Sequence, residues 1–463
     1  MKNEATLFFA KQAWVQGAWA SDVLLEVGPD GCWSRVQVQA TAQQQQGVTH
    51  LSGAVLPGLV NAHSHAFQRA IAGLTERRSA GVHASDDFWS WRDRMYSAAN
   101  RITPDQLEII ATQLYTELLA GGFTQVCEFH YLHHAMDGQA FANPAEMSLA
   151  LVRAAQGTGM GLTLLPTLYM RSGFSATGLR DDQRRFATTP DGIARIVEEV
   201  QRQTVNDPRI QVGVALHSLR AVSPVALAEV STYAKQAGLP VHIHIAEQTQ
   251  EVDDCMAHTG QRPIEWLLNH AEVDAHWNLV HATHTTAAEL AGVQRAGASI
   301  VICPATEANL GDGVFDLPGY AAVDGRWSLG TDSHVTRNWS EELRLLEYSQ
   351  RLTQRKRNVA AQVLGQESTA AALFEGALTG GVRASGVALA GIAVGQRADF
   401  FTLDAQASAL LGVPADHQLD AYVFSSPASA AQQVFVAGRP VPVGQEVAQQ
   451  FSSVMQTLWP SGH

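Results

Sequence analysis

The sequence predicts an α/β protein, a (β/α)8 TIM barrel with a small flanking β domain built from both chain ends. In the central part of the 463-residue chain, short apolar segments alternate with amphipathic segments of helix length. Strands that alternate with helices pair in parallel through right-handed crossovers, and eight such units in about 300 residues are typical of a closed barrel. The chain ends instead show strand-and-turn patterns. We therefore assign residues 56–385 to the barrel, and residues 1–55 and 386–463 to a small β-sandwich domain.

Eight segments of the central region have the apolar composition and the length of buried strands. They cover residues 54–62, 124–129, 162–168, 210–216, 241–245, 278–280, 299–303 and 326–330. Amphipathic patterns predict helices between them, as at 105–120, 190–204, 224–237 and 286–296. Towards the carboxyl end, the β domain is predicted from the strand-turn patterns at 391–404 and 433–439.

The composition argues against several classes of protein. A net charge of −13 disfavours nucleic acid or an anionic membrane surface as a partner. No apolar stretch reaches the roughly 20 residues that a transmembrane helix needs, and the apolar run at 7–10 is too short for a signal peptide. The four cysteines form no CxxC pair, which favours a reducing compartment. We therefore expect a cytoplasmic protein.

Residue types that bind metals follow four of the predicted strands. In a TIM barrel, the catalytic groups lie at the carboxyl ends of the strands. The ends of strands one, five, six and eight carry His63, His65, His242, His244, Glu247, His281 and Asp332. An HxH pair alone is a weak signal, because 18 histidines produce one by chance about once in such a chain. Four polar ends on one rim, however, indicate a site for a divalent cation.

These residues stand in segments that resemble the amidohydrolase superfamily. The matching segments are residues 56–65, His244-x-x-Glu247, His281, 331–333 and 395–399, so the resemblance covers nearly the whole chain. It implies that one divalent cation is held by four ligands, His63, His65, His244 and Asp332. His242 could replace His244, but only His244 fits the His-x-x-Glu spacing.

The resemblance also bears on the number of metal ions and on the chemistry. Binuclear members commonly use a carbamylated lysine after the fourth strand, and this chain has lysine only at Lys2, Lys11, Lys235 and Lys356. We therefore expect one ion, with Zn²⁺ preferred and Fe²⁺ or Mn²⁺ as alternatives. The resemblance implies that Asp332 helps to take a proton from the attacking water, that His281 polarises this water, and that Glu247 carries a proton to the departing nitrogen.

Other segments resemble one branch of this superfamily, whose members hydrolyse N-formimidoyl-L-glutamate to N-formyl-L-glutamate and ammonia in histidine degradation. These segments are residues 65–70, 88–96, 128–134, 217–220 and 306–313. The substrate is a linear amidine with two carboxylates, and the forked guanidinium of arginine is suited to bind carboxylates. The resemblance implies five substrate-binding residues, Gln68, Arg92, Tyr131, His217 and Arg220. The resemblance to the superfamily also implies a homodimer.

Two alternatives remain open at this point. One is a deaminase or chlorohydrolase of a cyclic base such as guanine on the same scaffold, for which aromatic stacking and neutral hydrogen-bond partners would be expected. The other is a non-catalytic protein that keeps the barrel but not the chemistry. Such proteins usually lose metal ligands, whereas here the set is complete.

Overall fold

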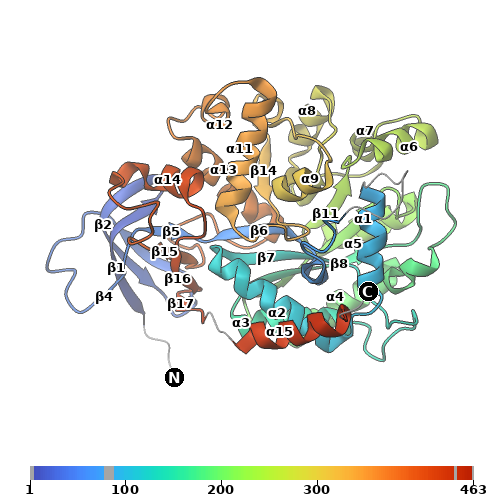
Figure 1. The fold of residues 1–463 in the computed structure, drawn as a ribbon, viewed down its shortest axis with the longest axis horizontal. Coiled ribbons are helices and arrows are strands. Elements are labelled where there is room, and N and C mark those ends of the chain that lie inside the picture. Colours follow the sequence, from blue (N-terminus) through green and yellow to red (C-terminus); the bar gives the residue numbers. More distant parts are fainter. Residues whose placement is uncertain (1–4, 78–87, 443–445, 461–463) are drawn as a thin grey trace.

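The computed structural model describes residues 5–77, 88–442 and 446–460 of the chain. Its larger sheet is a parallel barrel whose strands follow the order β14-β13-β12-β11-β10-β8-β7-β6 (Figure 1). These strands are β6 (Leu59–Ser64), β7 (Phe123–His130), β8 (Gly161–Leu168), β10 (Val214–Ser218), β11 (Val241–Ile245), β12 (Trp277–His281), β13 (Ser299–Ile302) and β14 (Arg326–Leu329). A parallel bridge between Ser64 and Asp332 joins the first strand to the end of the last. The predicted eight-stranded barrel is therefore confirmed.

Two of the predicted strands are each divided in two by a glycine. The predicted strand at 54–62 consists of β5 (Val55–Pro57), which belongs to the second sheet, and β6, which belongs to the barrel. Gly58 lies between them, where a Cβ atom would come within 2.4 Å of the Thr124 side chain. The segment at 210–216 likewise forms β9 (Ile210–Val212) and β10 on either side of Gly213. The apolar pattern continues across both glycines, so it does not reveal these divisions.

The second sheet is built from both ends of the chain, as predicted. Its strands follow the order β17-β16-β15-β5-β1-β2-β3, and β4 pairs with β1. Their bounds are β1 (Thr6–Val15), β2 (Ala18–Val27), β3 (Trp33–Gln37), β4 (Thr49–His50), β15 (Phe400–Leu403), β16 (Ala431–Val436) and β17 (Arg439–Pro440). Phe400 and Phe435 stack with ring centroids 4.3 Å apart, and Phe8 meets both rings edge-on. The domain limits near residues 55 and 386 stay a prediction.

Helices surround the barrel (Figure 1). They are α1 (Phe88–Ala99), α2 (Pro104–Ala120), α3 (Glu146–Thr158), α4 (Pro190–Thr204), α5 (Pro224–Ala237), α6 (Thr249–Thr259), α7 (Pro263–His270), α8 (Ala287–Ala296), α9 (Pro304–Leu310), α10 (Leu317–Ala321), α11 (Trp339–Gln354), α12 (Val359–Val363), α13 (Thr369–Ser385), α14 (Gln418–Ser425) and α15 (Glu446–Leu458). Three short 3-10 helices, η1 (Ala66–Ala70), η2 (Asp181–Phe186) and η3 (Ala415–His417), complete the elements. The carboxyl-terminal helix α15 packs on α2.

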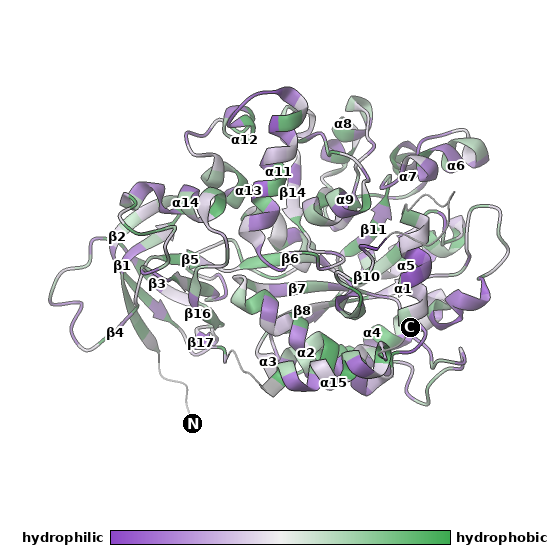
Figure 2. Ribbon diagram, in the orientation of Figure 1, coloured by the Kyte–Doolittle hydropathy of each residue, from purple (hydrophilic) through white to green (hydrophobic). Residues whose placement is uncertain are grey.

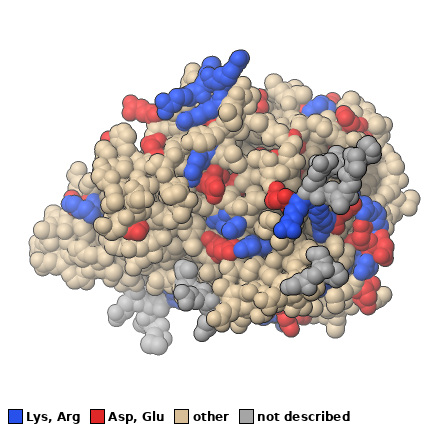
Figure 3. All heavy atoms as spheres, in the orientation of Figure 1, with Lys and Arg blue, Asp and Glu red and all other residues tan. Residues whose placement is uncertain are grey.

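The helices begin where the sequence supplies caps. The side chains of Thr103, Ser223 and Thr286 each accept a hydrogen bond from a backbone N–H in the first turn of the following helix. Figure 2 shows hydrophilic and hydrophobic residues mixed along most helices, as expected where one side packs on the barrel and the other faces solvent. Charged side chains cover a minor part of the face in Figure 3, and both signs are present on it. In the described parts of the chain, no helix is long and apolar enough to cross a membrane.

A buried ion pair links the β domain to the barrel. The Arg397 guanidinium donates to both carboxylate oxygens of Asp399, at 2.9 and 2.7 Å, and to Oε1 of Gln125 on β7, at 2.9 Å. The Asp399 carboxylate also accepts the N–H of Ala437 at 2.9 Å. The side chain of Arg397 is 8% exposed and that of Asp399 is fully buried, so water cannot solvate either charge if its partner is removed. The pair therefore fixes the return of the chain from the barrel to the β domain.

We expect Asp399→Ala to lower the free energy of unfolding by about 3–5 kcal/mol, because it leaves the Arg397 guanidinium buried without its charge partner. Urea denaturation followed by circular dichroism measures this loss. Glu272→Ala is the matched control, since it removes a carboxylate from an exposed pair with Lys235, and it should leave the free energy of unfolding nearly unchanged. Equal losses in the two variants would contradict the assignment.

Candidate active site

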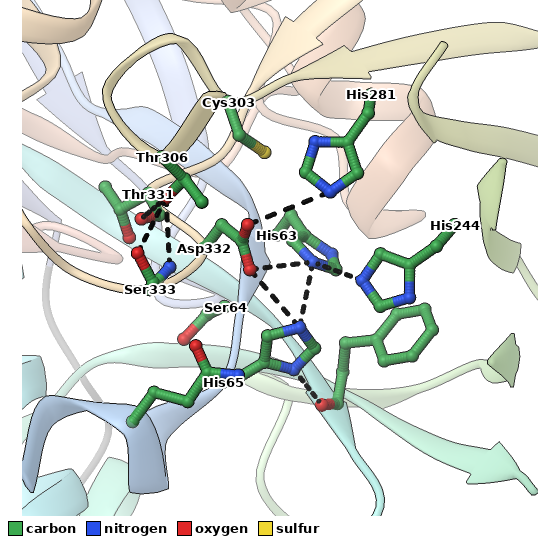
Figure 4. A network of polar contacts seen from close by, with 12 residues as sticks. His63, Ser64, His65, His244, His281, Cys303, Thr306, Thr331, Asp332 and Ser333 are labelled. Carbon is green, nitrogen blue, oxygen red and sulfur yellow. Dashed lines mark hydrogen bonds and ion pairs between the residues drawn. The ribbon is translucent and has the colours of Figure 1, made fainter. Parts of the chain in front are cut away.

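Four side chains from three strand ends converge on one point at the carboxyl end of the barrel (Figure 4). His63 and His65 come from β6 and the turn after it, His244 from β11, and Asp332 from the segment after β14. Nε2 of His63 lies 3.1 Å from Nε2 of His65 and 3.0 Å from Nε2 of His244. Oδ1 of Asp332 lies 3.4 Å from Nε2 of His63 and 3.3 Å from that of His65. All four ligand atoms lie within 4.8 Å of one another.

This group fits a divalent cation. Nδ1 of His65 donates to the carbonyl of Phe129 at 2.8 Å, and Nδ1 of His244 donates to the carbonyl of His217 at 2.9 Å. Each Nε2 lone pair is thereby left for the common centre, as is usual for histidines that bind metals. Burial, reinforced by neighbouring histidines, lowers the pKa of all three imidazoles, so they are held in the neutral form that ligates metals. Tetrahedral zinc with bonds of about 2.0–2.1 Å places its ligand atoms about 3.3 Å apart.

A buried carboxylate that the sequence reasoning missed supports the HxH segment. Glu128, at the end of β7, accepts hydrogen bonds from the Ser64 hydroxyl at 2.7 Å, the Ala66 N–H at 2.5 Å and the Tyr115 hydroxyl at 3.3 Å. Burial raises the pKa of Glu128 to about 8, although these donors oppose the shift. Its position near the end of a barrel strand was the available signal, but the residues that it contacts are 13 to 64 positions away.

The backbone is strained at the rim where these side chains meet. Ala246, His281 and Asp332 have φ angles of 53°, 69° and 46°, in the left-handed region that non-glycine residues seldom adopt. Each residue lies just after or at the end of a barrel strand. Such conformations cost about 1–3 kcal/mol each and persist where the surroundings fix them, commonly at functional sites.

Three titratable side chains form a second group beside the first. Nε2 of His281 lies 3.6 Å from Oε1 of Glu247 and 3.8 Å from Oδ2 of Asp332. Burial raises the pKa of Glu247 to about 7, and His281 opposes this shift. Burial lowers the pKa of His281, but Glu247 and other nearby groups outweigh it and raise this pKa well above the usual range. A proton can therefore be held among these groups near neutral pH, which suits acid–base catalysis.

One pocket joins both groups to the residues expected to bind substrate. Its lining includes Glu247, His281, Asp332, Gln68, Arg92, Tyr131, His217 and Arg220. The amide nitrogen of Gln68 donates to the Tyr131 hydroxyl at 3.2 Å. All five of the expected substrate-binding residues thus line the same pocket as Glu247, His281 and Asp332. Larger grooves exist elsewhere on the described surface, but they lack this set of residues.

The two arginines of the pocket lie near the ring of Trp89. The Cζ atom of Arg92, on α1, is 4.4 Å from the ring centroid, and that of Arg220, after β10, is 5.7 Å away. Across residues 5–77, 88–442 and 446–460, no carboxylate lies within 4.0 Å of either guanidinium. The pocket therefore presents two cations that lack an ion-pair partner in this part of the chain.

Two tyrosines of the pocket were also missed by the sequence reasoning. Tyr96 and Tyr169 line it, and their hydroxyls lie 3.2 Å apart. The amide of Gln183 donates to both hydroxyls, at 3.3 and 3.0 Å. Tyr169 directly follows β8, so its place after a barrel strand was a usable signal, whereas the contact of Gln183 depends on the tertiary fold.

Comparison with known proteins gives a consistent family. The sequence matches the Amidohydrolase family over residues 54–441. It is 44% identical over 431 residues to formimidoylglutamate deiminase of Pseudomonas aeruginosa, covering 93% of each chain. It is 27% identical over 323 residues to 8-oxoguanine deaminase of the same organism, covering 68% of this chain and 67% of the relative.

Solved structures agree with these matches. An amidohydrolase from Brucella melitensis is 40% identical with a TM-score of 0.90, and the match covers 98% of this chain and 99% of that one. An adenosine deaminase from Xanthomonas campestris with bound zinc has a TM-score of 0.77 and covers 98% of both chains. At 23% identity this second likeness shows the shared fold alone.

Proposed function

Because the chain belongs to the amidohydrolase family, we propose that it hydrolyses N-formimidoyl-L-glutamate to N-formyl-L-glutamate and ammonia in histidine degradation. The observation that carries this proposal is the pocket, which holds an acid–base group and two arginines without carboxylate partners in the described chain. The 44% identity to a formimidoylglutamate deiminase supports it.

The described cysteines, Cys32, Cys127, Cys255 and Cys303, are all free thiols, which supports a cytoplasmic location.

We propose that His63, His65, His244 and Asp332 hold one divalent cation, with Zn²⁺ preferred and Fe²⁺ or Mn²⁺ as alternatives. When bound, such a cation lowers the pKa of a water molecule, which can then attack the formimidoyl carbon. The lack of a lysine between residues 12 and 234 supports a single ion, because it removes the usual bridging ligand from the fourth barrel strand.

The chain's own residues move the protons. Asp332 has one carboxylate oxygen towards the histidines and the other 3.8 Å from His281, so it can take a proton from the attacking water. His281 orients and polarises this water through Nε2. Glu247, with its pKa raised to about 7 by burial, delivers a proton to the nitrogen as its bond to carbon breaks and ammonia leaves.

Recognition of the substrate falls to the other residues that line the pocket. The substrate carries two carboxylates, and each must find a partner when it leaves water, because a buried unpaired charge costs several kcal/mol. We propose that Arg92 and Arg220 bind them, and that Gln68, Tyr131 and His217 complete the hydrogen bonds. Burial lowers the pKa of His217 well below the usual range, and Arg220 contributes to this shift, so His217 acts as a neutral partner.

The main alternative is deamination of a cyclic base. It is favoured by the 27% identity to an 8-oxoguanine deaminase and by the aromatic side chains of the pocket, among them Tyr131 and Tyr169. A neutral heterocycle, however, would bring no anionic partner to either guanidinium, and the described residues place no carboxylate within 4.0 Å of them. Ammonia release measured with formimidoylglutamate, formiminoglycine, guanine and cytosine separates the two functions.

The purified protein should contain about one divalent ion per chain, because the described residues offer one complete set of ligands together with neutral imidazoles. Metal analysis by mass spectrometry measures this content. Chelation should abolish ammonia release, and added Zn²⁺ should restore it. Two ions per chain, both within the barrel, would contradict the single-ion assignment.

Glu247→Gln should lose at least about 10²-fold in turnover, because it removes the group that carries the proton. The variant should keep the fold and the metal content of the wild type, since Glu247 is not among the proposed ligands. Steady-state kinetics with formimidoylglutamate provide the measurement. Turnover close to that of the wild type would assign Glu247 a structural role.

Arg92→Met and Arg220→Met should each lose about 2–5 kcal/mol of transition-state binding, seen as a fall in kcat/KM for the dicarboxylate. Methionine keeps much of the volume of the side chain but removes the fork that binds a carboxylate. Metal content should be unchanged. Arg153→Met is the matched control, because it removes a partly exposed arginine paired with Glu108 and outside the pocket.

A substrate that lacks one carboxylate identifies the partner of each arginine. Its kcat/KM should be similar in the wild type and in the variant that has lost the arginine that binds the missing carboxylate. If both variants process formimidoylglutamate as well as the wild type does, these arginines do not bind its carboxylates, and deamination of a cyclic base gains support.

A further inference from the structure

His281 has two faces with different surroundings. It ends β12 with a left-handed φ of 69°, and it is 1% exposed. Its Nε2 faces the pocket, where it lies 3.6 Å from Oε1 of Glu247 and points towards Asp332 (Figure 4). Its Nδ1 faces away from the pocket and lies 3.3 Å from Oε1 of Glu307. Any role of Nε2 in the reaction therefore depends on the contacts that hold the ring on its Nδ1 side.

Glu307 is held in place before it meets His281. It lies on the short helix α9 and is 4% exposed. Its Oε1 accepts the backbone N–H of Cys303 at 2.9 Å, and its own backbone carbonyl accepts the N–H of Asp312 at 2.9 Å. The carboxylate is therefore fixed by its own segment, and the imidazole is oriented against it.

The contact with the Glu307 carboxylate then determines that Nδ1 of His281 carries a hydrogen. An ionised carboxylate can only accept hydrogen bonds, so the contact requires that Nδ1 carry the hydrogen. Nε2 is thereby reserved for the water and substrate side. The stacking of His281 on His244, with centroids 5.6 Å apart and an interplanar angle of 12°, restricts the tilt of the ring. The orientation of the ring is thus set by Glu307 behind it and by His244 beside it, and the hydrogen on Nδ1 is set by Glu307.

We propose that Glu307 is a positioning residue of the reaction, which acts through His281 by fixing its ring and keeping a hydrogen on its Nδ1. The inference rests on the proposed function, because it is measured as turnover of formimidoylglutamate. Among the described residues, no hydrogen bond or ion pair joins the Glu307 side chain to His63, His65, His244 or Asp332, and its contact with the site is the one with His281.

The same residues could also be considered as ligands of a second ion. Ligand atoms of His281, Cys303 and Glu307 lie within 4.8 Å of one another, and all three residues are buried. Oε1 of Glu307, however, already accepts hydrogen bonds from the Cys303 N–H and the His281 ring. These two hydrogen bonds account for the closeness of Glu307 to His281, and the Cys303 thiol contacts the His281 ring as well, so the group supports positioning of His281.

The experiment compares Glu307→Gln with Glu342→Gln in the metal-loaded enzyme. Both glutamates are buried, and each accepts one backbone N–H at the start of α9, from Cys303 and Ala305 respectively. Among the residues that the structure describes, Ala305 is the one hydrogen-bond partner of the Glu342 carboxylate. The two glutamates are therefore matched in their burial and in their hydrogen bond to the backbone of α9, and they differ in the hydrogen bond to His281.

In Glu307→Gln, the amide can turn its NH₂ towards Nδ1 and so favour the other tautomer of His281. We expect kcat to fall about 10- to 100-fold, as is usual when a partner of a site histidine is removed. KM for formimidoylglutamate and the metal content should stay within about twofold of the wild type, because the proposed substrate-binding residues and the metal ligands are intact. Glu342→Gln should keep kcat within about twofold.

The results that overturn the proposal are distinct from a failure of the proposed function. Wild-type kcat in Glu307→Gln, or an equal fall in both variants, overturns the positioning role. If Glu307→Gln does not fold, Glu307→Asp takes its place, since it withdraws the carboxylate by one methylene; wild-type kcat in that variant overturns the role too. If the wild type itself releases no ammonia from formimidoylglutamate, the proposed function fails, and the same two variants are compared on the substrate that is turned over.

Discussion

Closure of the barrel between β6 and β14 is the contact on which the site depends. A parallel bridge joins Ser64 to Asp332, the N–H of Asp332 donates to the carbonyl of His63 at 3.0 Å, and the N–H of His65 donates to the carbonyl of Asp332 at 3.3 Å. Behind them, the Asn61 side chain pairs with the side chain and backbone of Thr331. These bonds join segments about 270 residues apart in sequence. Without them the HxH pair and the carboxylate would not share one centre.

Burial at this closure accounts for much of the chemistry of the site. The same low-dielectric surroundings lower the pKa of the three converging imidazoles and raise the pKa of Glu247 to about 7. Neutral histidines are suited to bind a cation, whereas a carboxyl that titrates near neutral pH is suited to exchange protons. One physical cause therefore gives neighbouring groups different tasks, and hydrogen bonds to backbone carbonyls decide which nitrogen of the His65 and His244 rings takes part.

The sequence predicted those parts of the molecule that depend on local pattern. Alternating strands and helices indicated the barrel, and the strand ends placed His63, His244, His281 and Asp332 on one rim. Residues whose role is made by tertiary contacts escaped prediction. Glu128 supports the HxH segment from another strand, and Glu307 meets His281 across 26 positions of sequence. The division of the segment at 54–62 escaped too, because its apolar pattern runs through Gly58 and gives no sign that two sheets share it.

The pocket contains two positively charged arginines, although the net charge of the chain is negative. The formal net charge is −13, yet Arg92 and Arg220 approach the same indole ring and have no carboxylate within 4.0 Å in the described chain. Their effect is seen on His217, whose pKa is lowered by burial first and then by Arg220, His65 and Arg92. A local field of this sign attracts an anion in spite of the global charge, because charges beyond about 10 Å are screened by salt. The negative net charge and the two arginines of the pocket are therefore compatible, and the pocket, rather than the net charge, indicates which substrates can bind.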